Sequence, residues 1–344
     1  MSDLLPSSQK NIAHGFFTIA FMIFMMIVIG GITRLTGSGL SIVEWKPIMG
    51  FFPPFSQHDW QILFDQYQHS PEFLKINYML DLEGFKNIFW LEYIHRLWGR
   101  LIGIVLIIPT FLILKNKAYR KTYGLALIAL WILGLGQGVL GWYMVKSGLI
   151  SDPHVSPYRL TAHLLMGILL LGISLSAGLK ALMPLSLPSS KHFRKRFYLM
   201  IGMVVITATF GGLVAGLKAG LIYNTFPLMG DNWLPEEAFF MNPLWKNFTE
   251  NPAMVQWTHR MLATMTVLTI LIGLYSLKSV PYLLWWRRIL TALILCQFGL
   301  GILTVLYQAP LVLASLHQGI ALLLFIGLLL AWRWAEIKII AKAL

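Results

Sequence analysis

The feature that most constrains this chain is a series of long apolar segments separated by polar connections. A helix that crosses the hydrocarbon core of a bilayer needs roughly 20 consecutive, mostly apolar residues. Eight segments meet this length: 13–33, 95–114, 122–145, 160–183, 197–217, 257–277, 287–307 and 311–332. Charged residues make up 12% of the chain, against about 25% in a soluble domain. The sequence therefore predicts an all-α integral membrane protein with eight transmembrane helices.

Composition also excludes other classes of protein. Cys296 is the single cysteine of the 344 residues, so a disulfide-stapled secreted scaffold is ruled out. The net charge of +13 comes from short basic clusters between apolar segments, which is typical of a multi-pass membrane protein and gives no reason to expect nucleic acid as a partner. Residues 1–12 hold one basic residue, Lys10, which argues against an organelle transit peptide. We expect the protein to lie in the cytoplasmic (inner) membrane of a bacterium.

The direction of the helices follows from the charged residues in the connections. Basic residues gather at 115–121, 184–196 and 278–288, and these connections contain no Asp or Glu. The long connections at 34–94 and 218–256 hold eleven of the fourteen carboxylates. By the positive-inside rule, the basic connections and both termini are predicted to be cytoplasmic. The long connections then face the periplasm.

The sequence contains an internal repeat of four spans. Motifs recur in the same order in both halves: Gly30-Gly31 with Gly211-Gly212, 44–50 with 224–230, Glu92-Tyr93-Ile94-His95-Arg96 with Gln256-Trp257-Thr258-His259-Arg260, Gln137 and Gly141 with Gln297 and Gly301, and His163 with His317. An even number of spans per unit makes both halves enter the membrane in the same direction. We therefore predict two tandem pseudo-symmetric four-helix bundles, 13–183 and 197–332, joined by a basic cytoplasmic linker at 184–196.

Four of the nine histidines occupy equivalent places in the repeat, each in the outer part of an inward-running span: His95, His163, His259 and His317. Ionisable side chains inside a span are costly and mark candidate functional sites. For any one of them, a histidine hydrogen-bonded near the interface is the alternative. Their two-by-two arrangement across the repeat favours a shared function. The other five histidines lie at span ends or in connections, where a solvated or capping role is expected.

Two facing histidines in each half limit which metal or cofactor could bind between them. Zinc takes four protein ligands, or three and a water, and no cysteine or second carboxylate is available in each half to complete such a set. Haem iron needs only axial ligands, and its porphyrin suits the apolar space inside a four-helix bundle. The sequence therefore predicts two metal-binding haem sites, one between His95 and His163 and one between His259 and His317.

The two halves differ one helical turn before the first histidine of each pair. Glu92 precedes His95 by three residues, which places both on one helix face, whereas the repeat has Gln256 there. Glu92 could transfer protons during a reaction, or it could serve only as a carboxylate near a helix N-terminus. Arg96 and Arg260 follow the histidines and either pair with haem propionates or reach lipid headgroups. We predict chemistry at the N-terminal site and electron transfer at the C-terminal site.

The motifs around these residues resemble those of the haem A synthase family. The resemblance rests on 30–45 (GGITRLTGSGLSIVEW), 215–229 (AGLKAGLIYNTFPLM), Glu92-x-x-His95-Arg96 and Thr258-His259-Arg260-Met261, and it extends over nearly all of 14–332. It implies an oxidoreductase of haem A biosynthesis that oxidises the C8 methyl of haem O to a formyl group by successive hydroxylation, for the assembly of cytochrome oxidase.

The resemblance also implies a division of labour between the halves. His95 and His163 would flank the iron of the substrate haem O, with Glu92 beside it as the catalytic carboxylate. His259 and His317 would ligate a resident haem b, iron protoporphyrin IX, that relays electrons. Comparison of the repeats leads to the same partition from the residues alone.

The chain departs from the family at two points. Some members carry a cysteine pair in the first long connection, and this chain has none, so a disulfide role there is excluded. Lys218 stands where many relatives have an acidic residue, and the sequence assigns it no role. The resemblance implies haem O synthase and terminal oxidase assembly factors as partners, besides haem O and the lipid bilayer. The electron donor or acceptor, the source of the inserted oxygen, the residues around the farnesyl tail and a homo-oligomeric state stay open.

Two other functions would use some of the same features. A membrane cytochrome b in quinol-linked electron transfer, with two bis-histidine haems, would need the same four histidines. That class places its haems at different depths, whereas the four histidines here lie toward one face. A transporter with a parallel repeat would need broken helices and charges near mid-membrane, which the sequence does not clearly show. Haem A synthesis, with haem sites toward the periplasmic face, is the favoured interpretation.

Overall fold

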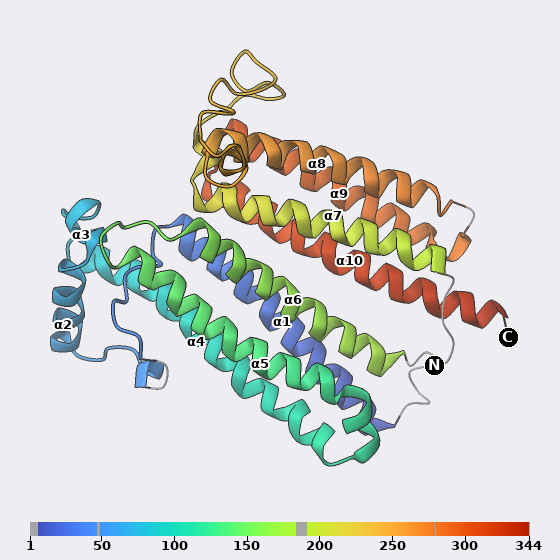
Figure 1. Cartoon of the computed structure of the whole chain (residues 1–344). Helices are drawn as coiled ribbons and strands as arrows, with labels where there is room; N and C mark the ends of the chain where they lie inside the picture. The colour runs from blue at the N-terminus through green and yellow to red at the C-terminus, as the bar shows by residue number, and fades with distance from the viewer. Residues whose placement is uncertain (1–5, 47–48, 184–190, 279, 344) are drawn as a thin grey trace. The chain divides into compact units, whose positions relative to one another are not determined.

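The computed structural model describes residues 6–46, 49–183, 191–278 and 280–343. Its long elements are helices: α1 (Ser7–Leu35), α4 (Leu82–Leu114), α5 (Lys117–Gly148), α6 (Pro157–Leu182), α7 (Lys191–Gly216), α8 (Pro252–Tyr275), α9 (Leu284–Leu306) and α10 (Leu311–Ala343) (Figure 1). Each contains a stretch long and apolar enough to cross a membrane, so the eight predicted spans are confirmed as candidate membrane helices. The molecule is a multi-pass membrane protein.

Side-chain caps explain why some helices begin where they do. The Asp81 carboxylate accepts a hydrogen bond from the backbone N–H of Gly84, and α4 therefore starts at Leu82, well before the predicted residue 95. Asn251 caps the start of α8 in the same way. Helix α7 begins at Lys191, so the later part of the predicted 184–196 linker is helical, while residues 184–190 lie outside the described part of the chain.

The chain forms two compact units. One consists of Thr18–Leu170, and the other of Met1–Phe17 together with Leu171–Leu344. In the second unit, α7 packs against α8 and α10, and α9 packs against the same two helices, which closes a four-helix arrangement. In the first unit, α4 packs along α5, and the indole N–H of Trp98 on α4 donates to the carbonyl of Met22 on α1 at 2.8 Å. The boundaries of the units lie inside α1 and α6, and the predicted halves 13–183 and 197–332 stay a prediction.

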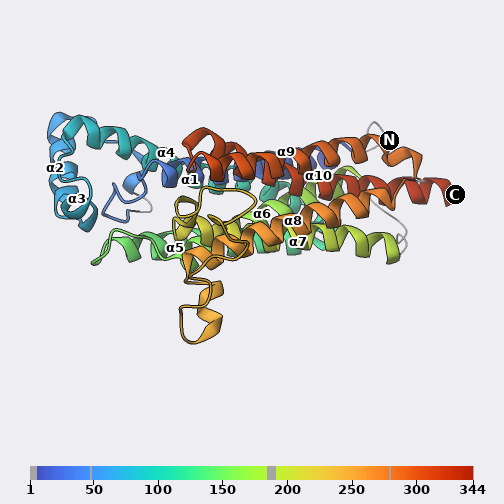
Figure 2. The same cartoon turned by 90° about the horizontal axis from the view of Figure 1, so that it is seen from above.

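The two long connections are structured differently. The first contains η2 (Met49–Phe51), α2 (Gln57–Gln68) and α3 (Pro71–Lys75), helices that the sequence did not predict. Aromatic side chains of α2 pack on the start of α4 in a buried cluster of Trp60, Phe64, Tyr67, Phe85, Phe89 and Tyr93. The second connection contains only the short helices η3 (Ala219–Leu221) and η4 (Leu244–Phe248), and it projects sideways from the ends of α7 and α8 (Figure 2). A further short helix, η5 (Pro281–Leu283), precedes α9.

Candidate functional site

The structure brings the four candidate histidines together in two pairs, each within its own half. His95 on α4 and His163 on α6 lie close enough for the charge of one ring to act on the other. His259 on α8 and His317 on α10 form the equivalent pair. All four histidines are half-buried. Two separate pairs are the arrangement that the repeat predicts.

Every one of these rings packs against a glycine on the preceding candidate membrane helix. The nearest ring atom to a Cβ built on that glycine lies at 2.9 Å for Gly30 with His95, 3.0 Å for Gly141 with His163, 3.3 Å for Gly211 with His259, and 2.9 Å for Gly301 with His317. Because a real Cβ atom hardly ever approaches another atom this closely, the glycines leave room for the imidazoles. The four glycines stand out in the sequence as repeat markers, but their contact with the histidines is visible only in the structure.

The C-terminal pair is held by backbone carbonyls. His259 donates from Nδ1 to the carbonyl of Thr207 on α7 at 3.1 Å, and His317 donates from Nδ1 to the carbonyl of Gln297 on α9 at 3.2 Å. A carbonyl can only accept, so Nδ1 carries the proton in both contacts. Nε2 then keeps its lone pair, which is the form of histidine that binds a metal. The Gln297 amide nitrogen lies 3.4 Å from His317 Nε2.

The N-terminal pair lacks this support. His163 Nδ1 is buried and has no hydrogen-bond partner. Gln137, the repeat equivalent of Gln297, donates instead to the main-chain carbonyl of His163 at 2.9 Å. Within the described ranges, the His95 ring makes no hydrogen bond either. These two imidazoles are positioned by packing against their glycines and are free to choose either tautomer.

Glu92 is buried, with 3% of its surface exposed, and four donors surround its carboxylate. Oε2 accepts from the Ser41 hydroxyl and from the Ile42 backbone N–H, both at 2.8 Å. Oε1 accepts from Arg96 Nε at 2.9 Å and Nη2 at 2.6 Å. Arg96 also donates to the carbonyls of Ile42 at 2.8 Å and Glu44 at 3.1 Å. The residue predicted as catalytic therefore also attaches the first long connection to α4.

The repeat equivalents attach the second connection to α8 with the opposite polarity. The Gln256 amide donates to the Tyr223 carbonyl at 3.0 Å. Arg260 donates to the carbonyls of Tyr223 at 2.9 Å, Thr225 at 2.9 Å and Leu228 at 3.1 Å. A carboxylate thus meets a backbone N–H in one half, and an amide meets a carbonyl in the other. Sequence comparison showed the exchange of acid for amide but not this contact, because it joins residues far apart in the chain.

The two arginines predicted as propionate partners are both used by their connections. Arg96 donates its hydrogen bonds to Glu92 and to carbonyls of the first connection. Arg260 is buried, and its Nε has no hydrogen-bond partner, so that N–H is available to an acidic ligand group. Propionate pairing stays a prediction for both residues, with a free donor described only in Arg260.

Further contacts order the second connection. Tyr223 donates from its hydroxyl to Glu237 Oε2 at 2.7 Å. This hydrogen bond raises the pKa of Tyr223 to about 12 and lowers the pKa of the half-buried Glu237 carboxylate. Lys218, to which the sequence assigned no role, adopts the left-handed backbone conformation with φ 52° and begins η3. An acidic side chain is not needed for that turn.

The donor set fits haem rather than a bare metal ion. Among the residues that the structure describes, no group of three or more His, Cys, Asp or Glu side chains could hold a metal ion. Each half instead supplies two imidazoles from different helices, in apolar surroundings that suit a porphyrin with two axial ligands. In the C-terminal half, the Nδ1 hydrogen bonds direct the lone pair to Nε2 on both rings.

Comparisons with known proteins show the family to which the chain belongs. Residues 14–329 match the COX15-CtaA family model, described as a cytochrome oxidase assembly protein. The chain is 46% identical to the heme A synthase of Nitrosospira multiformis, over 92% of this chain and 91% of that protein. It is 41% identical to heme A synthase COX15 of Homo sapiens, over 92% of this chain and 80% of that protein. These matches confirm the resemblance seen in the motifs, and the chain belongs to the COX15–CtaA family, the family of the haem A synthases.

Proposed function

We propose that this protein is a haem A synthase, an oxidoreductase that converts the C8 methyl group of haem O to a formyl group by successive hydroxylation. Family membership over more than nine-tenths of the chain supports the activity. The mechanism is inferred from a difference in hydrogen bonding between the two equivalent histidine pairs. Both C-terminal rings donate to backbone carbonyls, and the N-terminal rings do not.

The C-terminal pair is the proposed site of a resident haem b. His259 and His317 would hold its iron through Nε2, and Arg260 Nε is placed in the same half as a donor for a propionate. Carbonyls behind a ligating histidine fix its tautomer and increase its basicity, which suits a cofactor that stays bound. A haem b held here supplies one-electron transfer. The Thr207 and Gln297 carbonyls keep the two ligand rings in a single orientation.

The N-terminal pair is the proposed site of the substrate. Haem O must enter this site and the product must leave it, so weaker fixation of His95 and His163 is consistent with exchange. The farnesyl tail makes the substrate soluble in the bilayer, which suits a site built between membrane helices. Packing against Gly30 and Gly141 still places the rings.

Glu92 is the proposed proton carrier. It lies one turn before His95 on the same helix, within reach of the same face. Its Oε2 accepts from Ser41, whose hydroxyl can also accept a hydrogen bond. If Glu92 takes up a proton, the Ser41 hydroxyl can rotate and keep the contact. Glu92 can therefore hold or release a proton beside the substrate without losing its neighbour.

Orientation and partners extend the proposal. The basic short connections and acidic long ones support cytoplasmic termini, with both haem sites toward the periplasmic side of a bacterial inner membrane. An enzyme that makes haem O would supply the substrate, and factors that assemble a terminal oxidase would take the product. The repeated motifs support two pseudo-symmetric halves.

The haem content of the purified full-length protein tests the proposal. Protein from cells able to make haem O is extracted, and the haems are separated by chromatography. We expect wild type to contain haem b together with haem O or haem A, and Glu92→Ala to keep haem b and accumulate haem O or a partly oxidised form. Two haem b molecules per chain, unchanged by the substitution, would instead indicate an electron-transfer cytochrome.

A further inference from the structure

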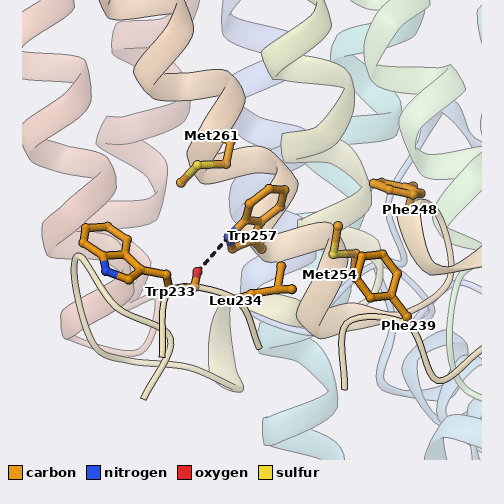
Figure 3. A pocket seen from close by; sticks show the side chains of 7 residues that line it. All are labelled: Trp233, Leu234, Phe239, Phe248, Met254, Trp257 and Met261. Atoms are coloured by element: carbon orange, nitrogen blue, oxygen red, sulfur yellow. Dashed lines mark hydrogen bonds between the residues drawn. The ribbon is translucent and has the colours of Figure 1, made fainter. Parts of the chain in front are cut away.

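A cavity of about 610 Å³ lies at the start of α8, beneath the second long connection (Figure 3). Helix α8 contributes Met254, Trp257 and Met261, which share one face because they are spaced by three and four residues. The connection contributes Trp233, Leu234 and two phenylalanines. Every lining side chain is apolar or aromatic, so the cavity has no group that would recognise a charge, a phosphate or a sugar.

Hydrogen bonds fix the walls of this cavity relative to each other. Trp257 Nε1 donates to the Trp233 carbonyl at 2.8 Å, which ties the connection to α8 (Figure 3). The fully buried Asn247 accepts from the Met241 N–H at 3.0 Å and donates to the Met241 carbonyl at 2.9 Å. The backbone of the connection is thus held in place by polar contacts, and its exposed aromatic side chains do not collapse into the cavity.

Beyond the cavity, the same face of α8 carries apolar side chains that are largely exposed. Met265, Leu268 and Ile272 follow Met261 at helical spacing and are 57%, 54% and 67% exposed. On a membrane helix, such a face contacts lipid tails. A hydrocarbon chain that runs along this face reaches the cavity at the start of the helix.

The other half of the repeat shows what normally covers this position. The equivalents of Met254, Trp257 and Met261 in the repeat are Trp90, Tyr93 and Leu97 on α4. Tyr93 and Leu97 pack in the aromatic cluster with side chains of α2, and the Trp60 ring lies 5.7 Å from the Trp90 ring. In the described second connection no α-helix corresponds to α2. In the first half a packed helix therefore covers this helix face, and in the second half an irregular connection covers it and leaves the cavity.

We propose that this cavity binds a hydrocarbon chain of a membrane phospholipid. The lining excludes a headgroup, the volume lies in the range of small-molecule pockets, and the lipid-facing side of α8 provides the route. The chain would replace the apolar contacts that α2 makes with α4 in the first half. This proposal uses no property of the haem sites and stands apart from the proposed function.

Photochemical labelling tests the site directly. The full-length protein is reconstituted in phosphatidylcholine vesicles that contain a phosphatidylcholine with a diazirine in one acyl chain, irradiated and digested for mass spectrometry. We expect label on the peptide with Met254 and Met261 and on the peptide with Trp233. Its yield should exceed that on residues 265–272 by about tenfold, because the cavity contacts the chain from α8 and from the connection, whereas the face beyond it contacts the chain from one side.

Two substitutions fill the cavity from opposite walls, and one serves as a control. Met261→Trp from α8 and Leu234→Trp from the connection should each lower the labelling about tenfold, and Met265→Trp, one turn along the same face, should leave it unchanged. Retained haem content shows that each variant is folded. Equal labelling along α8 that no variant changes would mean ordinary lipid contact, and a protein crosslinked at the cavity in cell membranes in place of lipid would mean a protein partner. Either result would overturn the proposal.

Discussion

In both halves a histidine ring rests on a glycine of the neighbouring helix, and an arginine next to a histidine binds the carbonyls of a long connection. The halves differ in the polar groups around these shared contacts. Both C-terminal rings donate to carbonyls of α7 and α9, whereas His163 Nδ1 has no partner and the His95 ring makes no hydrogen bond in the described residues. The two halves share the packing of the rings on glycines and differ in the hydrogen bonds that the rings make.

The same comparison separates two roles of the Glu92 side chain, positioning of the connection and proton exchange. Glu92 and Gln256 both bind the adjacent connection, so the positioning role does not require an acid. At this position of the repeat, a carboxylate is present only in the half proposed to bind substrate. What the acid adds is the capacity to exchange a proton.

Removing one ligand from each pair should give the largest difference. His317→Ala should abolish haem b binding, because a bis-histidine site loses half of its iron ligands. His163→Ala should keep haem b and lose haem O and haem A. The absorption spectrum and the extracted haems measure both variants. Loss of haem b from both variants to the same extent would remove the distinction between the halves.

The role of Glu92 is separated from the attachment of the connection by comparing it with Ser41. Glu92→Ala should lower turnover about a hundredfold or more, as expected for loss of a proton-transfer group. Ser41→Ala removes one hydrogen bond of about 1 kcal/mol and should lower turnover less than tenfold. Conversion of haem O is measured together with limited proteolysis of the first connection. If activity falls in parallel with proteolytic exposure in both variants, Glu92 acts only by positioning the connection.

The glycines predict a graded effect within one half. In Gly301→Ala the new Cβ would lie 2.9 Å from the His317 ring, and in Gly211→Ala it would lie 3.3 Å from the His259 ring. Gly301→Ala should therefore weaken haem b binding by about 1–3 kcal/mol, and Gly211→Ala by less. Haem titration of the apoprotein measures both. An equal effect of the two substitutions would show that the ring contacts do not limit the site.

The two equivalent glutamines should respond differently. Gln137→Ala removes a hydrogen bond between α5 and α6 and should cost about 0.5–1.5 kcal/mol of stability, seen as a lower Tm. Gln297→Ala removes a long contact to His317 Nε2, the atom proposed to bind iron, and should leave haem b affinity unchanged or higher. Weaker haem b binding in Gln297→Ala would mean that this amide supports the ligand.

The smallest effect concerns pH and the second connection. The Tyr223–Glu237 hydrogen bond lowers the pKa of Glu237, so its contribution is present above the ordinary carboxyl pKa and is lost as the pH falls through the lowered value. For Tyr223 the pKa is raised to about 12, so the contribution is present below about 10 and is lost as the pH rises toward 12. Hydrogen exchange of residues 231–241 should increase at both ends of that range. Tyr223→Phe should remove the dependence, and an unchanged profile would contradict it.

Much of this molecule follows from sequence patterns alone. The eight spans, the four histidines and their repeat can be predicted because apolar length and motif spacing are properties of the linear chain. The pairing of histidines follows from the same repeat. The first twelve or so residues of α4 and the helices α2 and α3 were missed, since they are too polar to stand out as spans and are stabilised by an aromatic cluster.

Only the tertiary structure decides what each polar side chain contacts. Whether His259 has a carbonyl behind it, and whether Glu92 meets an N–H or a carbonyl, depends on helix packing and on connections about 50 residues away in sequence. Such contacts leave no periodic pattern in the sequence, because a backbone N–H or carbonyl is the same group whichever residue type supplies it. The sequence by itself determined the membrane fold, the family and the candidate ligands. The packed structure decided which polar groups each ring contacts and where the second connection leaves a cavity against α8.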